Sequence, residues 1–189
     1  GSPIATWEEA KGLTDSDLLC FPKPNLPKKD IPVIDLFKYG SSNTVRCDKD
    51  MVWTETGSNH IKRTFTRRYL DMSDLDIAWL GGVYVGNGWS TIVEDYEEGK
   101  HNRYSMGVCF HSEHKDDIER AINALEKLVG KEHVHTFKGY KGKKVVQIVI
   151  ENQFLANFFV QSFGKHAINK HVPDFYMTSG NDEVIREFM

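Results

Sequence analysis

Cysteine is scarce in this chain, and long apolar runs are missing. The 189 residues include three cysteines, Cys20, Cys47 and Cys109, and an odd, small number of them argues against a disulfide framework. We therefore expect a reducing, intracellular location such as the cytoplasm. The longest apolar stretch, residues 77–85, is about half of what a membrane-spanning helix requires, so we expect no membrane partner.

Neither sign of charge dominates the sequence. Lysine and arginine together number 24, and aspartate and glutamate 27, which gives a net charge of −3. This balance excludes a histone-like protein, which binds nucleic acid through a large net positive charge. It is compatible with a local basic patch. The hydrophobic share of 40% is enough for a buried core, and the length fits one domain or one domain with an appendage.

Proline is concentrated near the start of the chain. Four prolines fall within residues 22–32, and because proline interrupts helices, we expect residues 1–70 to form an irregular, extended segment. Within it, residues 31–39 favour a short strand. Regular patterns begin after this region, so we divide the chain into two regions, 1–70 and 71–189.

The second region predicts an α+β fold. Apolar residues at spacings of three and four, followed by a glycine, predict an amphipathic helix over residues 116–129. The full set of predicted elements comprises helices over 74–85, 116–129 and 154–163, and strands over 90–96, 103–111, 133–138 and 144–150. Two hairpins that flank a helix imply an antiparallel four-stranded sheet with helices on one face. A further helix is predicted from residue 182.

Glycine is unusually frequent in the helix over residues 74–85. Its end reads Leu-Gly-Gly-Val-Tyr-Val-Gly-Asn-Gly over residues 80–88, and each glycine inside a helix costs about 1 kcal/mol relative to alanine. Another contact has to offset this cost. Gly82 and Gly86 are four residues apart and lie on one helical face, which predicts that the helix packs closely against a copy of itself and that Asn87 reaches a shared site.

Here the chain resembles the LAGLIDADG homing endonucleases. Residues 80–88 match the nine-residue motif of this family in register, and the predicted elements match its αββαββα repeat through about residue 163. Residues 170–174 are similar to the Lys-x-x-Pro segment that follows the repeat in many members. Residues 182–189 are similar to the lead-in to a second motif helix, and the chain stops before that motif. The resemblance covers roughly residues 70–189.

A shorter similarity connects the N-terminal region with inteins. Residues 4–13 are similar to the segment that follows the first splicing block of inteins, some of which carry an inserted endonuclease. Splicing requires a nucleophile at residue 1, a Thr-x-x-His block and a terminal His-Asn pair, and none of these is present. An intein-derived fragment is therefore compatible with the sequence, whereas a self-splicing intein is not supported.

The resemblance implies a site-specific endonuclease for double-stranded DNA. In this family two motif helices pack together, and an acid at the end of each holds a divalent metal over a scissile phosphate, with Mg²⁺ the expected cofactor. Since this chain has one motif, the resemblance implies a homodimer or a partner chain that supplies the second half. The implied helix interface consists of Leu80, Gly82, Val83 and Gly86.

The chain departs from the family at the acid position, which is Asn87. Beside Gly86, it occupies the position of the implied catalytic and metal-binding residue, but a neutral amide should bind Mg²⁺ far more weakly than a carboxylate. Two interpretations stay open: an inactivated or engineered metal site, and an asparagine that caps the helix. The matching functions are a catalytically impaired endonuclease and an inactive nucleic-acid-binding relative that acts as a regulator or splicing helper. A third is an interaction module that dimerises through this helix.

The family resemblance also implies that DNA lies on the sheet face that the helices leave uncovered. Side chains alternate along a strand, so Met106, Val108 and Phe110 are predicted to face the core and their neighbours to face DNA. The DNA-contact candidates are Arg103, Ser105, His111, Lys138, Lys141, Lys143, Lys144 and Gln147. The alternative is an ordinary solvated hairpin, and four acids within residues 94–98 of the other hairpin would repel phosphates.

Overall fold

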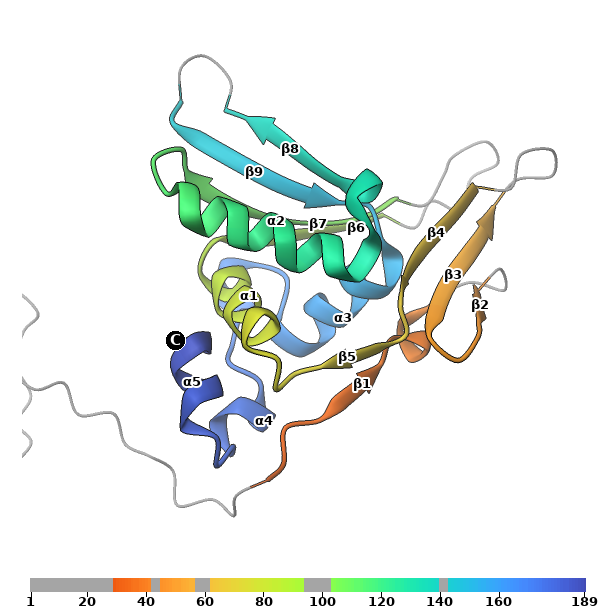
Figure 1. Cartoon of the computed structure of the whole chain (residues 1–189), viewed down its shortest axis with the longest axis horizontal. Helices are drawn as coiled ribbons and strands as arrows, with labels where there is room; N and C mark the ends of the chain where they lie inside the picture. Colours follow the sequence, from red (N-terminus) through yellow and green to blue (C-terminus); the bar gives the residue numbers. More distant parts are fainter. Residues whose placement is uncertain (1–28, 42–44, 57–61, 94–102, 140–142) are drawn as a thin grey trace, which may run out of the picture.

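The structure is a computed structural model that describes residues 29–41, 45–56, 62–93, 103–139 and 143–189 (Figure 1). It has an α+β fold in which every strand pair within a sheet is antiparallel. The largest sheet has the strand order β6-β7-β9-β8, and helices α1, α2 and α3 lie on one of its faces. The bounds in this part are α1 (Leu75–Asn87), β6 (Gly88–Val93), β7 (Arg103–His111), α2 (Lys115–Val129), β8 (Val134–Lys138), β9 (Val145–Ile150) and α3 (Gln153–Phe163).

The predicted order of helices and strands is confirmed in this part of the chain. The carboxylate of Asp74 caps α1 by accepting from the backbone N–H groups of Asp76 and Ile77. Gly164 ends α3 with a φ of +86°, a conformation that favours glycine. Strand β6 begins directly after α1, two residues earlier than its predicted start at residue 90, and the predicted end at residue 96 lies outside the described residues.

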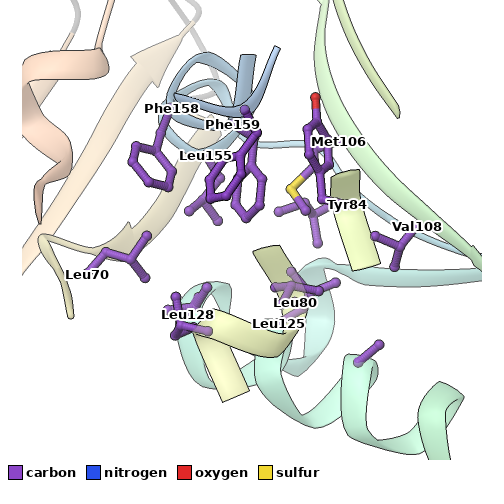
Figure 2. Close-up of a cluster of buried hydrophobic side chains, with 14 of the residues drawn as sticks. Leu70, Leu80, Tyr84, Met106, Val108, Leu125, Leu128, Leu155, Phe158 and Phe159 are labelled. Atoms are coloured by element: carbon purple, nitrogen blue, oxygen red, sulfur yellow. The ribbon is translucent and has the colours of Figure 1, made fainter. Parts of the chain in front are cut away.

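Side chains from the sheet and the three helices meet in one hydrophobic core. Met106 and Val108 of β7 are fully buried there, as the alternation of the strand predicts. Figure 2 shows them beside Tyr84 of α1 and Phe159 of α3. The ring centroids of Tyr84 and Phe159 are 4.8 Å apart. The sheet therefore has one face committed to the core and a second face that the helices do not cover.

The expectation of an irregular segment before residue 70 is wrong where the structure describes it. Two small sheets form there, with the orders β1-β5 and β2-β3-β4. Their elements are β1 (Val33–Asp35), the 3-10 helix η2 (Leu36–Tyr39), β2 (Val45–Cys47), β3 (Met51–Thr56), β4 (Lys62–Arg67) and β5 (Tyr69–Asp71). The clustered prolines all precede β1 and so do not interrupt these strands. Because Leu36 and Val52 are fully buried in the same core as α1, that core extends across residue 70.

The C-terminal segment returns to α1. It contains α4 (Asp174–Met177) and α5 (Asp182–Phe188), besides the short 3-10 helices η3 (Lys131–His133) and η5 (Ala167–Asn169). The guanidinium of Arg120 on α2 donates to Asp76 of α1 at 3.1 Å and to Glu187 of α5 at 2.8 Å. It also lies 4.6 Å from the centroid of the Trp79 ring. Lys127 and Arg120 lower the pKa of Asp76, so this carboxylate is ionised where it joins the helices.

The close helix contact predicted at the glycines is made within the chain. A Cβ atom at Gly82 would overlap the backbone carbonyl oxygen of Phe188 in α5, and nothing lies within 4 Å of one at Gly86. Leu80, expected at an intermolecular interface, is fully buried in the core. That expectation is therefore corrected for Leu80 and Gly82, because the chain's own core and α5 cover them. Val83 is half-buried and Gly86 is exposed.

These two glycines make a matched pair for a stability test. We expect Gly82→Ala to lower the free energy of unfolding by about 1–3 kcal/mol, because the added methyl group displaces the backbone of α5. Gly86→Ala should leave stability unchanged or raise it by up to about 1 kcal/mol, since alanine is the better helix former. Urea denaturation of both variants measures the difference, and equal effects of the two substitutions would contradict the packing of α5 on α1.

Candidate functional site

The last turn of α1 is anchored from three sides. The buried hydroxyl of Tyr84 donates to the backbone carbonyl of Gly164 at 3.0 Å and shares a hydrogen bond of 3.0 Å with the Ser90 hydroxyl on β6. Burial raises the pKa of Tyr84, so the phenol remains protonated and able to donate. The helix end that carries Asn87 is thereby fixed against both the sheet and the end of α3.

Lys170 supplies the third anchor. Its ammonium donates to the backbone carbonyls of Tyr84 at 2.7 Å and of Gly88 at 2.5 Å. Carbonyls at the end of a helix carry partial negative charge, so the ammonium adds a charged donor to the Tyr84 carbonyl, which also accepts from the backbone N–H of Gly88. Burial lowers the pKa of Lys170, while the nearby Cys109 opposes this shift. The Lys-x-x-Pro segment is thus joined to the end of α1.

Asn87 is the last residue of α1 and is exposed. Within the described part of the chain its side chain makes no hydrogen bond. The residue that follows, Gly88, ends the helix with a backbone N–H that donates to the carbonyl of Tyr84. The amide of Asn87 is consequently available to a ligand or partner at the end of the helix.

The residues at this helix end do not fit a Mg²⁺ site within one chain. Mg²⁺ is ordinarily held by one or two carboxylates, and the expected ligands here are the neutral amide of Asn87 and the backbone of Gly86. The Lys170 ammonium already occupies two adjacent carbonyl oxygens. Among the described residues, moreover, no three His, Cys, Asp or Glu side chains are grouped so that they could hold a metal ion.

The sheet face opposite the helices carries most of the predicted DNA-contact residues of the strands. In the antiparallel register Cys109 is opposite Gln147, and Thr91 is opposite Ser105, and directly opposed residues share a face. Alternation then assigns to this face Trp89, Thr91, Val93, Arg103, Ser105, Gly107, Cys109, His111, His135, Phe137, Val145, Gln147 and Val149. None of these described strand positions is acidic. Arg103 and His111 are exposed there, whereas Ser105 is buried.

The lysines expected at the second hairpin do not form one uniform group. Lys138 pairs in register with Val146, so it belongs to the side of the sheet that the helices cover, although it is exposed. Lys143 and Lys144 are exposed as well, and the ammonium of Lys144 lies 2.7 Å from a carboxylate oxygen of Glu113. Lys141 and the acids within residues 94–98 lie outside the described residues.

Three residues on or beside this face were missed as site residues. The Trp89 ring covers Gly107, where a Cβ atom would lie 2.7 Å from the indole. Phe137 is 54% exposed on β8, and Lys170 lies at the end of α1. The alternation of β8 could have singled out Phe137. The role of Lys170 depends on contacts with residues more than 80 positions away. A local sequence pattern does not predict such contacts.

The opposite surface of the molecule has a different character. An open hollow over α2 is lined by Asp76, Asp116, Glu119, Arg120, Asn123, Glu126, Lys127 and Lys131. Arg120 and Lys127 are engaged by Asp76 and Glu187. Carboxylates therefore lie on the helix side, whereas the strand positions that the structure describes on the opposite sheet face carry none.

No protein-family model matches this chain, and no curated protein matches its sequence. The LAGLIDADG resemblance therefore stays a prediction that depends on the motif and the order of elements. In the parts of the chain that the structure describes, no helix has the length and apolar character needed to cross a membrane. Cys47 and Cys109 are both free thiols.

The anchoring of α1 by Lys170 can be measured directly. We expect Lys170→Met, which keeps the apolar stem and removes the ammonium, to lower the free energy of unfolding by about 1–3 kcal/mol because two carbonyls lose their charged donor. Lys138→Met, at an exposed position of β8, serves as the control and should be nearly neutral. If chemical denaturation gave equal stability for both variants, the ammonium of Lys170 would not anchor the helix end.

Proposed function

We propose that this chain binds double-stranded DNA along the face of the β6-β7-β9-β8 sheet opposite the helices, as one half of a LAGLIDADG-type assembly. The observation that carries the proposal is the absence of acidic side chains from the described strand positions of this face, where Arg103, His111 and Gln147 lie. Arginine and glutamine side chains suit the donor and acceptor pattern of base edges in the major groove, which admits a two-stranded ribbon.

The charge difference between the two sides of the molecule supports the same orientation. Phosphates would be repelled by the carboxylates of the hollow over α2, among them Asp116, Glu119 and Glu126. At the β8–β9 hairpin Lys143 and Lys144 are exposed, and Lys144 would exchange its ion pair with Glu113 for a phosphate. Such phosphate contacts position a protein on the duplex without reading its sequence.

The second half of the assembly is a second copy or a separate partner chain. The exposed Gly86, with no atom within 4 Å of a Cβ built on it, leaves room for a backbone to approach the end of α1. A symmetric pair would present two copies of the sheet face to the two half-sites of a DNA target. This part of the proposal depends on the family resemblance.

We further propose that the chain on its own binds DNA without cutting it. Asn87 stands where the family has an acid, and the surrounding residues do not fit Mg²⁺. This favours an inactive nucleic-acid-binding relative, a regulator or splicing helper, over an active homing endonuclease. Cleavage would require a metal-binding carboxylate that the described residues do not supply at this position.

Salt dependence tests the proposed DNA interface. We expect Lys143→Ala/Lys144→Ala to reduce the slope of log affinity against log salt by about two, since each lost phosphate contact removes about 0.9 from the slope for duplex DNA. Lys115→Ala/Lys131→Ala removes the same charge from exposed positions near the helices and should leave the slope nearly unchanged. Fluorescence anisotropy with a labelled duplex measures both.

Two results would overturn the proposed interface. One is the absence of duplex binding by the unchanged chain at low salt. The other is an equal loss of slope in both double variants, because bulk charge and not the hairpin would then hold the DNA.

The role of Asn87 is tested by Mg²⁺ titration. We expect Mg²⁺ to leave the melting temperature of the unchanged chain where it is and to raise that of Asn87→Asp, because a ligand that binds only the folded state stabilises it. Magnesium-free buffer with the same ionic strength, set by sodium chloride, provides the control. An identical response of the two proteins would show that residue 87 is not at a relict metal position.

A further inference from the structure

The small β2-β3-β4 sheet presents a pair of aromatic rings outside the hydrophobic core. Trp53 of β3 and Phe65 of β4 are directly opposite in the antiparallel register. Their ring centroids are 5.9 Å apart and the rings are inclined by 33°. Both side chains are half-buried, and neither belongs to the core cluster or packs against it.

The other face of this sheet holds it firmly on the rest of the protein. Val52 and Thr66 are fully buried, and the Thr66 hydroxyl donates to the backbone carbonyl of Leu128 in α2 at 3.1 Å. Asn152, just before α3, also reaches the backbone carbonyl of Phe65 at 3.5 Å. The aromatic pair is thus mounted on a sheet whose position is set by two helices, and not on a loop.

Positive charge accompanies the aromatic pair. Strand β4 contains three basic residues and no acid among its six residues. On the face of the rings, Arg67 pairs in register with Met51 and is exposed. Arg46 lies opposite Trp53 in register, and Glu55, the one acid on the described part of this face, is 3.8 Å from the Arg46 guanidinium and accepts from the Trp53 indole at 3.4 Å.

We propose that this face, defined by Arg46, Trp53, Phe65 and Arg67, binds a single nucleic-acid strand by stacking unpaired bases on the two rings. Aromatic side chains on a sheet stack bases of any sequence, because every base has a π-face, and flanking cations follow the phosphate backbone. On the inward face of the same strands Val52, Thr54 and Thr66 are buried, so both rings lie on the outer face. This site is separate from the duplex-binding face of the β6-β7-β9-β8 sheet.

Two ligands share this chemistry, unpaired DNA and RNA. The test therefore uses a labelled oligothymidylate and an oligouridylate of the same length, with affinity measured by fluorescence anisotropy on the full chain. We expect Trp53→Leu to weaken binding by about tenfold or more, the loss that follows from removing one stacked base. Phe37→Leu, an exposed aromatic position in η2 outside both sheets, is the matched control and should leave the affinity unchanged. The oligonucleotide that binds more tightly identifies the preferred strand.

A conservative variant separates stacking from folding. Trp53→Phe keeps an aromatic ring, so it should retain the affinity while losing the part of the tryptophan quenching that oligonucleotide binding causes in the unchanged chain. Arg67→Ala should reduce the salt slope by about 0.7, the value for one phosphate contact to a single strand. Thermal melts of each variant verify that the fold is intact.

Three outcomes would overturn this inference. They are an unchanged chain that binds neither oligonucleotide at low salt, equal affinities of Trp53→Leu and Phe37→Leu, and undiminished quenching in Trp53→Phe. Duplex affinity measured on the same variants distinguishes the two sites, because Trp53→Leu should not affect it. Failure of duplex binding would refute the proposed function and leave the single-strand site to be judged by its own measurements.

Discussion

The burial of α1 is the constraint on which the rest of the structure depends. Tyr84 is fully buried between α3 and β6, and its hydroxyl bonds to Gly164 and Ser90. Lys170 closes the end of the same helix, and Gly82 admits the backbone of α5. Every one of these contacts uses the last half of α1, so the sheet, the C-terminal segment and the exposed Asn87 are held in one arrangement.

The two faces of the larger sheet follow from that arrangement. Once the helices occupy one face, strand alternation commits Met106 and Val108 to the core and leaves Arg103 and Gln147 on the other side. Apolar burial determines which face is which, since a shift of one residue in register would expose the core residues. The lack of acidic residues at the described strand positions of the uncovered face is thus a consequence of packing as well as composition, and it carries the proposed DNA-binding function.

Two features determine which ligands the end of α1 can bind: an asparagine at position 87, where the LAGLIDADG family has an acid, and the long-range contact of Lys170. Asn87 offers a neutral oxygen where a carboxylate would hold a cation. The ammonium of Lys170 donates to the carbonyls of Tyr84 and Gly88 beside it, and burial lowers the pKa of this group. Together these two features leave the end of α1 without the carboxylate that a Mg²⁺ site requires.

Local sequence signals determined the regular elements after residue 70. Asp74 as a helix cap, the apolar spacing of 116–129 and Gly164 with its positive φ act over a few residues, so they could be predicted from the chain alone. The alternation of β7 identified Arg103 and His111 as residues of one face, and that of β9 identified Gln147, since the period of a strand is a local property.

Only the tertiary structure decided the remaining features. The strands before residue 70 are short, three to six residues each, and they are stabilised by pairing with distant segments and by the burial of Leu36 and Val52. The cover over Gly82 comes from α5 of the same chain, and the anchor at Gly88 comes from Lys170. Such contacts join residues far apart in sequence, and their free energy comes from burial and hydrogen bonding that exist only once the chain is folded.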